Sequence, residues 1–227
     1  MPDDEAEVAR ATRLMLRPIA SPLPLGFFAF AIGSGLLSME QFGLLGSGQE
    51  RNLALLLAVF VFPAQLLAGV FAFLGREPIA ATALSIIAFS WPAAALVTVL
   101  APPGDSTSPL AGALDALIAL VLGLLVPVGI RGKPVVGTVV LLGATRYALN
   151  AAVEFTGSGV VELLSAATGT LILVLGVYGG LALVLEDTAH RTVLPFPRLG
   201  EARSAMQTDL HDQAASVTRE AGVRRQL

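Results

Sequence analysis

The chain has 227 residues, of which 55% are hydrophobic and only 14% are charged, and its formal net charge is −3. Soluble domains carry about 25% charged residues, so this composition indicates an all-α integral membrane protein. The chain has no cysteine, which excludes disulfides and cysteine-ligated metals. No basic patch interleaved with aromatic residues indicates nucleic-acid binding, and we expect neither a cofactor nor a metal.

The apolar residues are gathered in blocks long enough to cross about 30 Å of hydrocarbon, which takes about 20 helical residues. These blocks predict a membrane domain over 18–190, with six spans at approximately 18–39, 52–75, 78–100, 110–130, 134–154 and 163–185. The charged leader, 1–17, suits either a short amphipathic helix on the membrane surface or a solvated segment. The polar tail, 191–227, is expected to be mostly flexible.

Positive charges are distributed unequally between the two sides of the predicted membrane domain. An even number of spans places both termini on one side, and that side carries the arginines of the leader and the tail together with Arg76, Arg131 and Lys133. The other side carries Arg51 alone. Because arginine and lysine favour the cytoplasmic loops, we expect both termini to be cytoplasmic, in a bacterial inner (plasma) membrane.

Polar or helix-bending residues interrupt the first three spans. The first span opens on Ser-Pro-Leu-Pro-Leu-Gly at 21–26, where two prolines suit a helix start because the missing N–H groups are not needed there. In the second span, Pro63 predicts a kink, and Gln65 should face protein or water. Trp91 in the third span lies too deep for the interfacial belt of aromatic residues, so it should pack between helices or edge a pore.

The fifth span carries a stripe of small or polar residues. Gly143, Arg146, Asn150 and Glu154 follow one another at intervals of three, four and four, so they share one helix face. A guanidinium at a helix centre costs about 2.5–3.5 kcal/mol on insertion scales and is normally turned toward protein or water. The stripe therefore either lines a water-filled path or seals against another helix.

Arg146 allows three interpretations. It faces a pore and attracts carboxylates, for which a guanidinium offers a bidentate fork; it forms an ion pair with Asp115, which lies at similar depth in the fourth span; or it reaches the outer interface. The first two are compatible, because an ion pair beside a pore can exchange its anion for substrate. Asp115 and Glu154 are also candidate proton carriers, although an interfacial position is the favoured interpretation of Glu154.

Three glycines mark the sixth span. Gly169, Gly176 and Gly180 share one face at spacings of seven and four, including a GxxxG pair. Small residues at this spacing permit close approach between helices in lipid. We expect this face to pack against another helix or subunit, the alternative being a lipid-embedded helix that tolerates glycine.

Short motifs in a fixed order connect the chain to a known family. Pro22, Pro24 and Gly26 belong to the opening motif of the first span, and Arg191-Thr-Val-Leu-Pro195 follows the sixth. With Gln65 and Trp91 between them, these motifs resemble those of the acetate uptake transporter family, the SatP or YaaH type of acetate and succinate permease. The resemblance covers about 18–197, which includes all six spans.

The resemblance implies six-helix protomers that assemble as hexamers, each protomer with its own pore for small carboxylates, often proton-linked. By position, it implies a pore constriction at Phe30, Ile87 and Gly143, where hydrophobic side chains would gate by dewetting. The family usually has an aromatic residue in place of Ile87 and apolar residues around Arg146.

Together, these observations predict a channel or transporter for acetate-like or succinate-like carboxylates, with proton linkage as part of the expectation. The proposed pore follows the first, third and fifth spans. The alternatives are a channel for neutral solutes of the urea or amide type and a non-transporting membrane scaffold. An enzyme is not expected, because the chain has no HExxH, GxSxG, GxGxxG or Walker A motif and no histidine within a span.

Overall fold

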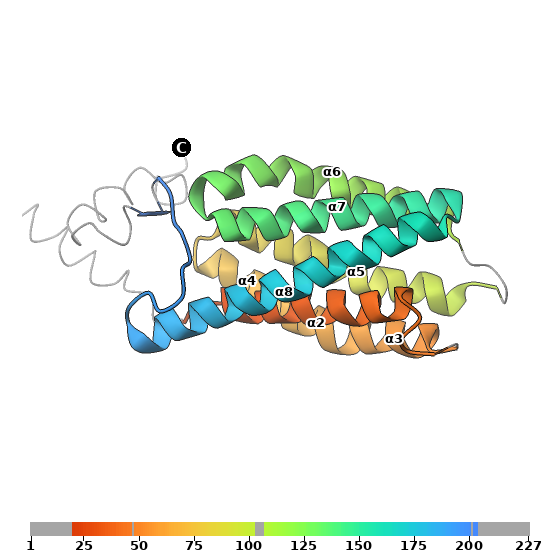
Figure 1. Cartoon of the computed structure of the whole chain (residues 1–227), viewed down its shortest axis with the longest axis horizontal. Coiled ribbons are helices and arrows are strands. Elements are labelled where there is room, and N and C mark those ends of the chain that lie inside the picture. Colours follow the sequence, from red (N-terminus) through yellow and green to blue (C-terminus); the bar gives the residue numbers. More distant parts are fainter. Residues whose placement is uncertain (1–19, 47, 103–106, 201, 204–227) are drawn as a thin grey trace, which may run out of the picture.

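The computed structural model describes residues 20–46, 48–102, 107–200 and 202–203, and all regular structure in these ranges is helical. The elements are α2 (Leu23–Gln41), α3 (Glu50–Leu56), η1 (Leu57–Val61), α4 (Phe62–Leu74), α5 (Pro78–Leu100), α6 (Pro109–Gly132), α7 (Pro134–Thr156) and α8 (Gly159–Ala189). They form an elongated bundle whose helices run roughly along its long axis (Figure 1). The predicted leader and the tail beyond 203 lie outside the described residues.

The described helices include six units long and apolar enough to cross a membrane, with α3, η1 and α4 joined into one unit over Glu50–Leu74. The predicted all-α membrane class is therefore confirmed. The sixth unit is longer than predicted, because α8 has 31 residues and so measures about 46 Å. Its charged last turns continue as helix until His190 adopts a left-handed conformation at φ 52° and ends it.

Prolines and one glycine account for several helix ends. Pro78, Pro109 and Pro134 each occupy the first position of a helix, where a missing N–H has no helical partner to lose. α7 ends at Gly157, whose φ of 63° belongs to the left-handed region that glycine adopts without strain. These residues define helix ends and connections, so consecutive membrane-spanning units run antiparallel.

The predicted disturbance near Pro63 is a widened turn rather than an isolated kink. The five residues of η1, Leu57–Val61, form a π-helical turn directly before α4, and Pro63 lies in the first turn of α4. A proline removes the N–H that an α-helix needs at this point. The i→i+5 pattern of a π-turn accommodates that loss within a continuous rod.

The two ends of the bundle are named by the helices that begin or end there. The near end is where α2 begins and α8 ends, and the far end is where α2 ends and α8 begins. α2 packs on α8, α4 on α5, and α6 on α7. A Cβ at Gly176 would lie 2.9 Å from Cβ of Ala31, so the predicted packing role of the glycine face on the sixth span is confirmed.

The chain folds back across the near end after α8, as the blue coil in Figure 1 shows. The hydroxyl of Tyr178 donates to the Pro195 carbonyl at 2.6 Å, and the Leu199 amide donates to the Gly132 carbonyl at 2.8 Å. Phe196 is buried with its ring perpendicular to that of Phe27, at a centroid distance of 6.3 Å. The prediction of a mostly flexible tail from 191 onward is therefore wrong for 191–200, because apolar residues in this segment join the core.

Candidate functional site

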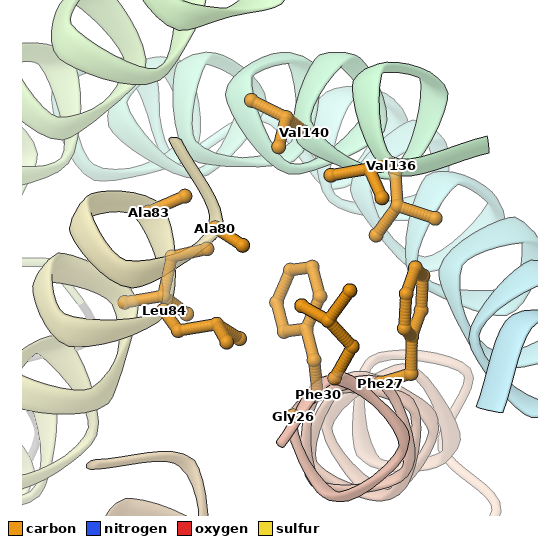
Figure 2. Close-up of a pocket in the computed structure, with 11 residues that line it drawn as sticks. Gly26, Phe27, Phe30, Ala80, Ala83, Leu84, Val136 and Val140 are labelled. Carbon is orange, nitrogen blue, oxygen red and sulfur yellow. The ribbon is translucent and has the colours of Figure 1, made fainter. Parts of the chain in front are cut away.

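An apolar cavity lies between α2, α5 and α7 in the near half of the bundle (Figure 2). It contains about 420 Å³ of space that no protein atom fills, part of it continuous with the outside. Its lining residues are Leu23, Gly26, Phe27, Phe30, Ala80, Ala83, Leu84, Ile87, Val136, Val139 and Val140. All three helices begin at the near end, so each contributes its first two or three turns.

Helical spacing explains why these residues meet. On α2 the lining positions recur at intervals of three and four residues, which places them on one face, and α5 and α7 follow the same rule. Figure 2 shows Phe27 and Phe30 extending from α2 toward Val136 and Val140 of α7. A Cβ at Gly26 would lie 2.7 Å from Cδ1 of Leu84, so glycine at this motif position permits the close approach of α2 and α5.

The predicted constriction residues lie at the inner end of this cavity. Phe30 and Ile87 both line it. Gly143 does not, but a Cβ built on it would be 3.5 Å from Cζ of Phe30. The structure thus brings the first, third and fifth spans together at these positions, while their role as a gate stays a prediction.

Arg146 lies beyond the constriction and does not line the cavity. It is only 3% exposed. Its Nη1 donates to the Ser34 carbonyl at 3.1 Å and to Oγ of Ser38 at 2.9 Å, and its Nη2 donates to Oε1 of Gln41 at 3.0 Å. A Cβ at Gly169 would overlap Nη1, so α8 leaves the space that the guanidinium occupies between α7 and α2.

Two of the three interpretations of Arg146 are therefore wrong. Asp115 is not an ion-pair partner: the Arg146 side chain is directed toward α2 and α8, whereas Asp115 belongs to α6. Nor does the side chain reach the outer interface, because the guanidinium is enclosed by protein. The pore-facing interpretation stays a prediction, because Arg146 is held by neutral acceptors on α2 and does not line the cavity.

The last two residues of the fifth-span stripe, Asn150 and Glu154, also contact other helices. Asn150 accepts a hydrogen bond from Oγ of Ser165 on α8 at 2.5 Å. Glu154 accepts one from the Ser108 amide, at the start of α6, at 2.5 Å. These contacts do not support one continuous pore face, because the stripe meets α2 at Arg146, α8 at Asn150 and the start of α6 at Glu154.

Gln65 and Trp91 form a buried pair. Nε1 of Trp91 donates to Oε1 of Gln65 at 2.7 Å, and Gln65 has no exposed surface. The indole lies over Gly33 of α2, where an added Cβ would meet it at 2.9 Å. Trp91 therefore packs between helices, and Gln65 faces protein. Nε2 of Gln65 is the one fully buried side-chain polar atom without a partner among the residues described.

A second buried pair was missed by the sequence analysis. The hydroxyls of Ser90 on α5 and Tyr147 on α7 hydrogen-bond to each other. Because Ser90 also donates to the Ile87 carbonyl at 2.7 Å, Tyr147 is the donor between them. The only signal in the sequence was a phenol next to Arg146 inside an apolar span. Ser34 and Ser38 gave no comparable signal, since isolated serines are common in membrane helices, and Gly169 was expected to permit helix packing rather than to make room for a guanidinium.

The remaining motif residues have structural positions. Pro22 caps α2 and Pro24 occupies its first turn. Pro195 provides the carbonyl that Tyr178 binds, whereas Arg191 is exposed. No group of three or more metal-ligating side chains occurs within the described ranges.

Comparison with known proteins returns a clear structural relationship. No protein-family model and no curated protein matches the chain. The solved structure of the bacterial acetate channel SatP does match, with a TM-score of 0.69 and 20% sequence identity, over 79% of this chain and 99% of that chain. This chain has the fold of a bacterial acetate channel. The resemblance stated from short motifs is confirmed at the level of the fold, which spans nearly the whole length of SatP.

Proposed function

We propose that the protein is a membrane channel for small carboxylates. The observation that carries this proposal is the apolar cavity between α2, α5 and α7, in a chain that shares its fold with an acetate channel. The proposed path follows these three helices from the near end and passes Phe30, Ile87 and Gly143. A narrow apolar point of this kind gates by excluding water until a solute enters.

The size of the cavity fits small solutes. The empty space between the lining residues is about 420 Å³ when the part open to the outside is counted, which leaves room for molecules of the size of acetate or succinate. The side chains of Phe27 and Phe30 face the methyl or methylene part of such a solute. The lining itself contains no charged residue, so the cavity discriminates by size and apolarity.

Substitution at Gly143 tests the path. An alanine there meets Phe30 at ordinary contact distance, so Gly143→Ala should conduct. The larger side chain of Gly143→Leu fills the space beside Phe30. It should reduce labelled acetate flux into proteoliposomes by at least about tenfold. Gly123→Leu on α6 is the matched control, because a side chain at Gly123 meets no atom within 4 Å. Equal flux in Gly143→Leu and Gly123→Leu would reject this path.

A channel for neutral solutes of the urea or amide type is the second candidate, and the absence of polar side chains in the cavity lining favours it. Flux of urea or acetamide above that of acetate at every pH would establish this alternative. A non-transporting scaffold predicts no flux of any of these solutes.

Proton linkage, succinate transport, hexameric assembly and cytoplasmic termini belong to the same proposal. Many large apolar side chains are exposed, among them Leu110, Leu117 and Leu124 of α6, which supports contact with lipid or with further copies. Native mass spectrometry from detergent tests the hexamer. Acetate uptake that rises with an imposed proton gradient tests the linkage.

A further inference from the structure

A buried positive charge lies one helical turn beyond the constriction. Ser34, whose carbonyl binds Arg146, follows Phe30 by four residues on α2, a rise of about 6 Å. On α7, Arg146 follows Gly143 by three residues, a rise of about 4.5 Å. A solute that passes Phe30 toward the far end therefore comes within reach of the guanidinium field, although Arg146 does not line the cavity.

This charge has no compensating carboxylate among the residues described. All three acceptors of Arg146 are neutral oxygens on α2. The ion pairs Lys133–Glu77 and Arg198–Glu186, both in the described ranges, do not involve Arg146. A guanidinium does not lose its proton in proteins. Only 3% of Arg146 is exposed in the isolated chain, so an anion would reach it from within the bundle rather than from the lipid-facing surface.

The guanidinium also retains unused donors. Of its five N–H groups, both on Nη1 and one on Nη2 have acceptors. The Nε–H and the second N–H on Nη2 have none within the part of the chain that the structure describes. Free N–H groups on a guanidinium form strong, charge-assisted hydrogen bonds with carboxylate oxygens.

The position of this cation is set by the surrounding helices. Two donors of Nη1 are fixed to successive turns of α2, and Ser38 is itself held by a hydrogen bond to the Ser34 carbonyl at 2.8 Å. The space at Gly169 exists only because that residue lacks a Cβ. An ionisable side chain held inside a membrane domain at such cost usually serves function.

We propose that Arg146 makes the channel selective for the ionised carboxylate, by binding a carboxylate group through its free N–H groups on the far side of Phe30. This inference rests on the proposed function and deepens it, since it specifies the anion rather than the neutral acid or a neutral amide. Arg146 is thereby a specificity-determining residue, whereas the cavity selects for size.

The first experiment uses the unaltered full-length chain in proteoliposomes at pH 7. Labelled acetate uptake is measured in the presence of excess trifluoroacetate, which is an anion, or excess acetamide, which is a neutral isostere of acetate. We expect trifluoroacetate to inhibit acetate uptake and acetamide to inhibit much less. Equal inhibition by the two competitors would overturn the inference, and this result requires no variant to fold.

The second experiment compares Arg146→Gln and Arg146→Lys with the control Arg51→Gln, an exposed arginine at the far end whose Nη2 donates to the Val99 carbonyl. Loss of a charge-assisted contact should lower the acetate-to-acetamide flux ratio by about tenfold or more in Arg146→Gln. Arg146→Lys keeps the charge without the fork and should fall between, while Arg51→Gln should match the unaltered chain.

The outcomes separate the two proposals. If the unaltered chain carries acetate and Arg146→Gln retains its acetate-to-acetamide ratio, the inference about Arg146 is overturned and the channel remains. If the unaltered chain carries no carboxylate at all, the proposed function is overturned and the inference falls with it.

Discussion

Two arginines in this protein, the half-buried Arg198 and the buried Arg146, are held in opposite ways. Arg198, at the near end, forms a bidentate pair with Glu186 at 3.1 and 2.5 Å and lies 5.7 Å from the ring centroid of Phe196. Arg146, deep between α2, α7 and α8, has neutral acceptors only. A structural arginine in a protein is normally paired with a carboxylate. The contrast indicates that Arg198 holds the return of the chain in place, whereas Arg146 keeps a net charge inside the bundle.

Gly169→Val, which disturbs the site of Arg146, should have the largest effect on stability. A Cβ at this position overlaps Nη1 of Arg146, so the guanidinium must leave acceptors that lie in a buried site. Overpacking and lost charged hydrogen bonds together should reduce the free energy of unfolding by about 3 kcal/mol or more. Reversible unfolding in mixed detergent micelles measures the change.

A double variant separates this clash from a general effect on α8. Truncating the guanidinium reopens the space, so Gly169→Ala should cost less stability in an Arg146→Ala background than in the unaltered chain. The difference is the coupling free energy of the two positions. A coupling near zero would show that the two residues do not compete for the same space.

Phe196→Ala tests how much the contact between Phe196 and Phe27 stabilises the near end of the bundle. Phe196 is buried against Phe27, a cavity-lining residue. Truncation of a buried phenylalanine costs about 3–5 kcal/mol, and we expect about 3 kcal/mol here because the site is at the end of the bundle. The freed Phe27 ring should also raise the flux of butyrate relative to acetate. Phe42→Ala, at an exposed position of the far end, should change neither measurement.

Arg198→Gln should have the smallest effect of the three and the opposite signature to Arg146→Gln. It leaves the partly buried Glu186 carboxylate without its cation, which should lower the free energy of unfolding by about 1–2 kcal/mol. The acetate-to-acetamide flux ratio should not change, because this pair is remote from the constriction. A shift in that ratio as large as the one expected for Arg146→Gln would remove the functional contrast between the two arginines.

The candidate site was partly predictable from residue patterns. Phe30 and Ile87 were placed at a constriction through motifs that align with a known family, and both line the cavity. The valines of α7 that complete the lining were not singled out, since they look like any lipid-facing residues in a membrane span. The polar partners of Arg146 were missed for a related reason: Ser34 acts through its backbone carbonyl, which no side-chain pattern reports.

The sequence by itself determined that the chain crosses a membrane six times as helices. Hydrocarbon requires apolar runs of about 20 residues and leaves no water to satisfy an open backbone, so the runs specify both the element and its approximate ends. The tertiary structure alone decided where Arg146 points. Lipid and protein interior are about equally apolar, so the apolar faces of α7 do not fix its rotation. That rotation follows from two sets of contacts that are distant along the chain. The acceptors on α2 are more than 100 residues from Arg146, and Gly169, which leaves space for the guanidinium, is 23 residues from it.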